Sequence, residues 1–197
     1  MVVSGPAGVG KTTLLERVFQ CCEVPLVRSI SATTRPPRQG ESDGIDYHFL
    51  ATEEFETRRR RGEFIECFQV FESGYWYGTL RSQVAVGLQA GKWVVLNIDV
   101  QGALAVMAQF SDAVTIFVRP GTVDELQRRL RGRATESEEA IRQRLQQAPR
   151  ELALADRYGY QVINDDMQRA VEEICTILTQ QWKAQQNDRR TAGRSNC

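Results

Sequence analysis

The sequence predicts an α/β fold with a mainly parallel sheet, and two patterns support this prediction. Short apolar strands alternate with amphipathic helices over most of the chain, which is the order that places helices against a parallel sheet. Residues 93–98 form a continuous apolar run, as expected for a strand buried on both faces. Residues 31–79 break this order with polar turns, aromatic residues and short alternating runs. We therefore expect an inserted small mixed β-sheet in that segment.

Apolar periodicity locates the individual elements. We expect strands at residues 1–4, 26–30, 93–98, 113–118 and 160–163, with two more at 47–50 and 64–70 in the insert. We expect helices at residues 11–22, 53–61, 81–90 and 101–109. Capping boxes, formed by Thr122 with Glu125 and by Thr135 with Glu138, precede two further helices, and Asp165 or Asp166 caps a final one.

These elements group into one domain over residues 1–182. The expected core comprises residues 1–30, 80–120 and 145–182, the insert residues 31–79, and a short helical lid residues 121–144. Residues 183–197 are polar and basic without an apolar period, so we expect a disordered tail there.

Composition excludes several classes of protein. The 197 residues carry no net charge, so no overall positive field is available to attract a nucleic acid. No apolar run approaches the roughly 20 residues of a membrane span, and no secretory leader is recognisable. The five cysteines are odd in number and contain no C-x-x-C pair, which favours reduced thiols over disulfides or zinc. We therefore expect a cytoplasmic protein without nucleic-acid or membrane partners.

A phosphate-binding motif lies near the start of the chain. Residues 5–12 read G-P-A-G-V-G-K-T and fit the pattern G-x-x-x-x-G-K-[ST], between an expected strand and an expected helix. In such a loop the backbone N–H groups point at phosphate, Lys11 can reach the β- and γ-phosphates, and the Thr12 hydroxyl can ligate Mg²⁺. This predicts a P-loop NTPase-type sheet. The predicted nucleotide-binding residues are Gly5, Pro6, Ala7, Gly8, Val9, Gly10, Lys11, Thr12 and Thr13.

Two questions stay open at this point. Asp99 follows the apolar run 93–98, where it can either hold a metal beside the phosphate loop or cap the next helix. The group that accepts the phosphate can be water, a protein, a sugar or a nucleotide.

Further motifs, most of them in the insert, bear on the acceptor. Residues 31–41 read S-A-T-T-R-P-P-R-Q-G-E, followed by G-I-D-Y at 44–47, G-E-F-I-E at 62–66, Y-G-T at 77–79, I-D-V-Q-G at 98–102 and V-I-N-D-D at 162–166. In these stretches, from about residue 2 to residue 180, the chain resembles the guanylate kinase family. The resemblance implies an enzyme of purine nucleotide metabolism that transfers the γ-phosphate of ATP to GMP, and to dGMP, with Mg²⁺.

The resemblance also implies roles for individual residues. The phosphate of GMP would be held by Arg35, Arg38, Tyr47 and Tyr77, in agreement with the bidentate geometry that arginines offer. Glu66 would accept from N1 and N2 of guanine, which selects guanine over adenine. The implied GMP-binding set is Ser31, Arg35, Arg38, Glu41, Tyr47, Glu66, Tyr77, Gly78, Thr79 and Asp99. The implied catalytic set is Lys11, Arg35 and the lid arginines Arg133 and Arg144, while Asn164 would contact the adenine of ATP.

Other features receive simpler interpretations. The four consecutive arginines at 58–61 are expected to form a solvated helix face. Asn97 stands where the resemblance implies an acidic residue. A peptide-binding scaffold module is disfavoured by the intact phosphate loop, and a sugar-phosphate kinase would have no use for Glu66 and Thr79 as base readers. We expect a monomer or a homodimer.

Overall fold

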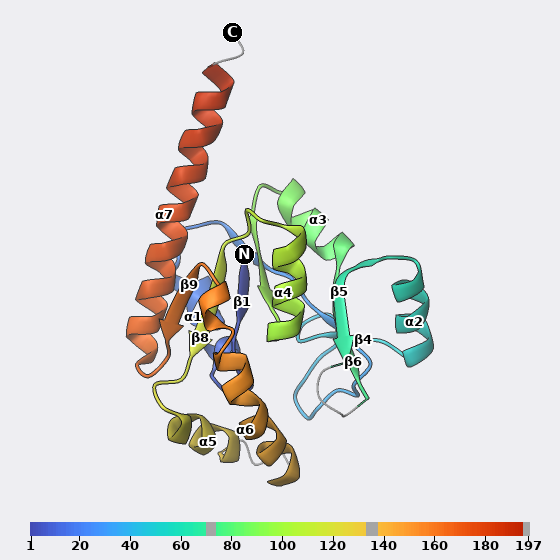
Figure 1. Ribbon diagram of the computed structural model, residues 1–197. Coiled ribbons are helices and arrows are strands. Elements are labelled where there is room, and N and C mark those ends of the chain that lie inside the picture. Colours follow the sequence, from blue (N-terminus) through green and yellow to red (C-terminus); the bar gives the residue numbers. More distant parts are fainter. Residues whose placement is uncertain (70–73, 133–137, 195–197) are drawn as a thin grey trace. The chain divides into compact units, whose positions relative to one another are not determined.

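The computed structural model describes residues 1–69, 74–132 and 138–194, with side chains described through residue 188. It contains two sheets (Figure 1). The larger sheet is built from β1 (Val2–Ser4), β2 (Leu26–Arg28), β7 (Trp93–Asn97), β8 (Thr115–Arg119) and β9 (Tyr160–Ile163), in the order β2-β7-β1-β8-β9. The smaller is built from β3 (Ala32–Thr33), β4 (His48–Phe49), β5 (Phe64–Gln69) and β6 (Trp76–Leu80), in the order β4-β3-β6-β5.

Helices connect these strands. They are α1 (Lys11–Cys21), α2 (Thr52–Arg60), α3 (Arg81–Gln89), α4 (Val100–Gln109), α5 (Val123–Arg131), α6 (Glu138–Leu152) and α7 (Met167–Arg194), with a 3₁₀ turn at Ala155–Arg157. The pairings of β7 with β1 and with β2 are parallel. In the smaller sheet β3 pairs in parallel with β4, whereas β6 pairs antiparallel with both β3 and β5. The expected fold, a P-loop type of parallel sheet with an inserted small mixed sheet, is confirmed.

The chain divides into two compact units. The first comprises Met1–Gly5 and Leu26–Ile116, and the second comprises Pro6–Pro25 and Phe117–Cys197. None of the helices in the described part of the chain combines the length and apolar character that crossing a bilayer requires.

The small sheet of the first unit has its own apolar core. Phe55 of α2 is fully buried and stacks on Phe64 of β5, with 4.5 Å between the ring centroids. Ala32 and Leu80 complete this core. The Thr33 hydroxyl donates to the Trp76 carbonyl at 2.9 Å, which adds a side-chain link between β3 and β6. These contacts give the residues that follow β3 a rigid base.

In the second unit α1 packs against α7. Leu14, Leu15 and Val18 form the buried face of α1, and Ile174 and Leu178 are buried on α7. The helix α7 continues to Arg194, so the disordered tail expected from residue 183 is wrong for residues 183–194 (Figure 1). Residues 183–194 lack an apolar stripe but contain alanine, lysine, glutamine and arginine, whose intrinsic propensity favours continuation of the helix. Residues 195–197 lie outside the described residues.

Candidate active site

The phosphate loop joins β1 to α1, as its motif predicts. Gly10 is the N-cap of α1 and has φ +94, a left-handed conformation that side chains rarely adopt. A Cβ on Gly10 would lie 2.8 Å from Nδ2 of Asn164, and a Cβ on Gly8 would lie 2.5 Å from Cδ2 of Leu130. These two glycines are therefore required both by backbone geometry and by the side chains packed against the loop.

A group of polar contacts holds the loop at the carbonyl of Val9. This oxygen accepts from Nη1 of Arg129 at 2.9 Å and from Nδ2 of Asn164 at 2.8 Å. Nη2 of Arg129 also donates to the backbone carbonyl of Asn164 at 2.7 Å and to the carboxylate of Glu125, one turn earlier on α5. We call Glu125, Arg129 and Asn164 the loop brace. It ties the phosphate loop to α5 and to the residue after β9.

Asn164, expected to contact adenine, is fully buried in this brace. Its Oδ1 atom is also buried and has no hydrogen-bond partner among the described residues. Since the side chain donates to Val9, it supports the loop from the protein interior.

The cationic and hydroxyl groups of the expected triphosphate site lie at the start of α1. The Lys11 ammonium donates to the carbonyl of Pro6 at 3.1 Å, across the loop. Thr12 and Thr13 are exposed in the first helical turn. Arg144 is half-buried on α6, whereas Arg133 and the capping residue Thr135 lie outside the described residues.

The expected GMP-phosphate residues gather in the first unit around Arg35. This side chain is 8% exposed, and its Nη1 and Nη2 atoms donate to the two carboxylate oxygens of Glu41 at 2.8 and 2.9 Å. Nε donates to the Tyr77 hydroxyl at 3.2 Å, and Nη1 also donates to the Pro36 carbonyl. Counted over the described residues, these bonds engage all the guanidinium N–H groups except one on Nη2. The expected bidentate grip of Arg35 therefore competes with Glu41 for the same donors.

Electrostatics keep this cluster charged. Burial opposes the charge of Arg35, but the bonds to Glu41 and Tyr77 outweigh it and raise the pKa of the guanidinium. The hydrogen bond from Arg35 lowers the pKa of the Glu41 carboxyl. The guanidinium carbon of Arg35 lies 5.3 Å from the ring centre of Tyr47, and burial raises the pKa of the Tyr47 phenol. The phenol therefore stays a hydrogen-bond donor at neutral pH.

Arg38 and Glu41 lie in the turn that follows. The backbone N–H of Arg38 donates to Oε2 of Glu41 at 2.7 Å, so this carboxylate organises the turn as well as Arg35. The Arg38 side chain is exposed.

The expected base-reading residues form a buried pair on the hairpin of β5 and β6. The Thr79 hydroxyl donates to Oε1 of Glu66 at 2.6 Å, and these two residues are register partners. Glu66 is 7% exposed and Thr79 fully buried. Burial, assisted by the charge of Asp99, raises the pKa of the Glu66 carboxyl to about 7.

Small residues make room for this carboxylate. Gly102, in the first turn of α4, would carry a Cβ only 2.8 Å from Oε2 of Glu66. A Cβ on Gly78 would lie 2.9 Å from the backbone carbonyl of Glu66, so this glycine allows β6 to approach β5 closely. Asp99 caps α4 by accepting from the Gly102 N–H at 2.8 Å, one of the two roles left open for it. The carbonyl of Ser31, a half-buried residue, accepts from the N–H of His48, which starts β4.

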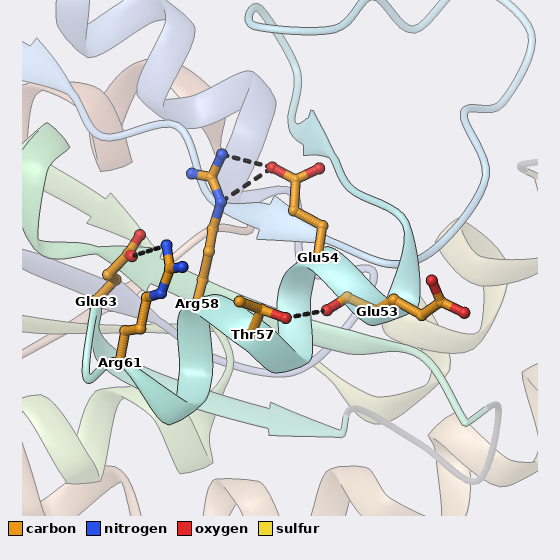
Figure 2. Close-up of a pocket in the computed structure, with 6 residues that line it drawn as sticks. All are labelled: Glu53, Glu54, Thr57, Arg58, Arg61 and Glu63. Carbon is orange, nitrogen blue, oxygen red and sulfur yellow. Dashed lines mark hydrogen bonds and ion pairs between the residues drawn. The ribbon is translucent and has the colours of Figure 1, made fainter.

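The run of arginines at 58–61 lies apart from these groups on the small sheet's helix α2. Figure 2 shows Arg58 paired with Glu54, and Arg61 with Glu63, around a surface hollow of about 460 Å³. Arg59 pairs with Glu56 at 2.9 Å and lies over the ring of Trp76. Because neighbouring carboxylates already pair with these arginines, the hollow is a poor site for a phosphate.

Sequence reasoning did not single out three positions of the candidate site. Glu125 and Arg129 of the loop brace are four residues apart on α5, a spacing that suggests a helix surface pair. Their contact with Val9 has no local signal, because it depends on how distant segments pack. Gly102 was quoted within a motif, but its spacing to Glu66 appears only in the structure.

Comparisons with known proteins identify the family of the chain. The guanylate kinase family model matches residues 1–181. A guanylate kinase from Rhodopirellula baltica is 54% identical over 184 residues, covering 93% of this chain and 88% of the relative. One from Rubrobacter xylanophilus is 48% identical over 179 residues, covering 90% and 92%. The crystal structure of guanylate kinase from Anaplasma phagocytophilum is 34% identical, has a TM-score of 0.72, and the match covers 90% of this chain and 82% of that one. A phosphate loop, a buried arginine and a buried pair of a carboxylate with a hydroxyl thus occur in a chain that belongs to the guanylate kinase family.

Proposed function

We propose that this protein transfers the γ-phosphate of ATP to GMP, giving ADP and GDP, and that it also accepts dGMP. The observation that carries the proposal is the buried pair of Glu66 and Thr79. Guanine offers N1–H and the N2 amine as neighbouring donors, and an ionised carboxylate accepts from both. Adenine offers no such pair of donors at these positions, so it would leave the carboxylate with the Thr79 hydroxyl but without a donor from the base.

The phosphate of GMP would bind at the arginine cluster. Arg35 supplies its remaining Nη2 donor, Tyr47 and Tyr77 supply hydroxyls, and Arg38 supplies an exposed charge from the adjacent turn. Glu41 would orient Arg35 through their two-point contact. A phosphate oxygen of GMP is already anionic, so it attacks the γ-phosphorus of ATP without a protein base.

The triphosphate of ATP would bind on the phosphate loop. Its N–H groups and Lys11 balance the charge that spreads over the transferring group. Arg144 would add a further positive charge, as would Arg133.

Mg²⁺ is the expected cofactor, and the residues present fit it. No cluster of three or more His, Cys, Asp or Glu side chains that could hold a metal occurs among residues 1–69, 74–132 and 138–194. Thr12 is exposed in the first turn of α1, where its hydroxyl would supply one oxygen to a cation that arrives with the phosphates of ATP. When bound, Mg²⁺ would neutralise phosphate charge. We also propose that the protein acts in the cytoplasm. Its number of cysteines is odd, which favours the reduced thiols of that compartment.

The test is a coupled assay of ADP release with ATP and Mg²⁺. The acceptors are GMP, dGMP, AMP, CMP, UMP and buffer alone. We expect turnover with GMP and dGMP only. If circular dichroism shows that the protein is folded but the assay shows no turnover with GMP, the proposal is overturned. That outcome would favour a binding module or a sugar-phosphate kinase.

The Glu66 carboxyl makes GMP binding depend on pH. Its ionised form accepts from guanine, and its pKa is raised to about 7, so protonation below pH 7 removes the acceptor. We expect KM for GMP to rise about tenfold from pH 8 to pH 6. The GMP phosphate also titrates near pH 6. In the Glu66→Gln variant only the titration of the GMP phosphate remains, so its KM for GMP should depend less on pH. If KM for GMP changes with pH equally in the variant and the wild type, this prediction is wrong.

The loop brace predicts a defect specific to the triphosphate. Asn164→Ala removes one donor to the Val9 carbonyl, so the loop loses its fixed orientation, and we expect KM for ATP to rise about 10- to 100-fold. The KM for GMP should stay within twofold. Gln161→Ala serves as the control. The Gln161 side chain, on β9, accepts a hydrogen bond from Arg119 and not from the phosphate loop, so this variant should keep the KM for ATP.

A second donor separates support of the loop from contact with adenine. If Asn164 acts through the loop, the Asn164→Ala loss should be equal with ATP and with another nucleoside triphosphate as donor. A loss confined to ATP would show that the side chain reads the base.

A further inference from the structure

Two thiols from distant parts of the chain lie side by side in the second unit. Sγ of Cys21 and Sγ of Cys175 are 3.7 Å apart, although the residues are 154 positions apart in the sequence. Cys21 is the last residue of α1, and Cys175 lies on the part of α7 that packs against α1. The buried apolar faces of the two helices hold the thiols in this proximity, since Ile174, next to Cys175, is fully buried.

The two thiols differ in their access to solvent. Cys21 is exposed, whereas Cys175 is half-buried. Burial, together with hydrogen bonds that the Cys175 thiol makes with Cys21 and Cys22, raises the pKa of Cys175, which therefore stays protonated at neutral pH. A small oxidant from solvent therefore has better access to the thiol of Cys21 than to the thiol of Cys175.

We propose that Cys21 and Cys175 form an oxidation site at which hydrogen peroxide is the oxidant and Cys175 is the resolving thiol. The thiolate of Cys21 attacks one oxygen of peroxide, so an S–O bond forms, the O–O bond breaks and hydroxide leaves. Cys21 is then a sulfenic acid. The sulfur of Cys175 attacks the sulfur of Cys21, an S–S bond forms, the S–O bond breaks, and the departing oxygen takes the proton of Cys175 to leave as water. Two thiols and one peroxide thus give one disulfide and two waters.

This chemistry protects the exposed thiol and links two helices. A sulfenic acid without a neighbour proceeds to sulfinic acid, which thiols do not reverse, whereas a disulfide is restored by a dithiol. The bond would form at the end of α1 opposite Lys11, about 15 Å along an 11-residue helix. We therefore expect kcat and KM to change less than twofold on oxidation. Because the bond closes a long loop, the thermal midpoint should rise by about 5 °C or more.

The test treats the full chain with a small excess of hydrogen peroxide and follows its mass and its peptides. We expect the wild type to lose about 2 Da, to yield a peptide linking Cys21 to Cys175, and to recover its mass with a dithiol reductant. Cys175→Ser should instead carry sulfinic acid on Cys21, a gain of about 32 Da at that peptide. Cys21→Ser changes only an exposed side chain, which preserves folding, and should form no such link.

Cys67 provides the control. It is a half-buried free cysteine on β5 of the first unit, so Cys67→Ser should oxidise like the wild type. The proposal is overturned if wild type and Cys175→Ser accumulate sulfinic acid at Cys21 equally. It is also overturned if fragmentation of the linked peptide places the bond on Cys22, which also hydrogen-bonds Cys175, or if the product is a disulfide between two chains.

Discussion

Replacing Lys11 with methionine is expected to lower kcat about 100- to 1,000-fold. Methionine keeps most of the length and removes the charge, so the loop loses the one side chain that its motif aims at the β- and γ-phosphates. The proposed GMP contacts come from other residues, and the affinity for GMP, measured by calorimetry without ATP, should change less than twofold. Initial rates at saturating ATP and GMP provide the first measurement.

Lys92→Met is the matched control for this variant. Lys92 is an exposed residue between α3 and β7, so its loss should leave kcat within twofold. A Lys11→Met enzyme that keeps more than a tenth of the wild-type kcat would show that the ammonium does not stabilise the transferring group.

Replacing Glu66 with glutamine is expected to reduce kcat/KM for GMP by about 1,000-fold or more, without a comparable change in the response to AMP. The amide keeps the shape of the carboxyl but presents an NH₂ group toward two guanine donors. Its remaining oxygen also has to serve the Thr79 hydroxyl, which donates to Glu66 in the wild type. A site built on buried polar pairs loses discrimination steeply when one partner is wrong.

Gly102→Ala tests the same assignment without changing the carboxyl. The added Cβ would meet Oε2 of Glu66 at 2.8 Å, so the carboxylate must move and the preference for GMP over AMP should fall. Gln101→Ala, at the exposed neighbouring position of α4, should keep it. Unchanged selectivity in both Glu66→Gln and Gly102→Ala would remove Glu66 from the base site.

How far these features could be predicted depends on how local each one is. The phosphate loop is a continuous pattern, and the structure has it between β1 and α1 as expected. The alternation of strands and helices is also a pattern of neighbouring residues, and it correctly predicted the parallel sheet. The end of α7 was predicted too early. An apolar stripe marks only the part of a helix that packs on a core, and the residues after 182 continue the helix without such a stripe.

The site was less accessible to local reasoning. Glu66 and Thr79 meet through the register of a hairpin, and only the resemblance to a family singled them out. The two-point contact of Arg35 with Glu41 spans six residues of an irregular turn, for which no periodicity exists. Its consequence, that the described residues leave Arg35 one N–H for a ligand, required the side-chain geometry.

The loop brace has a consequence for the order in which the chain acquires its activity. The Val9 carbonyl is bound by groups 120 and 155 positions later in the sequence. During synthesis the first ten residues therefore leave the ribosome long before their hydrogen-bond partners exist. The phosphate loop reaches its final conformation only after Asn164 has been made and β9 has paired. A chain truncated before that point would contain the complete motif yet hold nucleotide weakly, since contacts of such long range form late in folding.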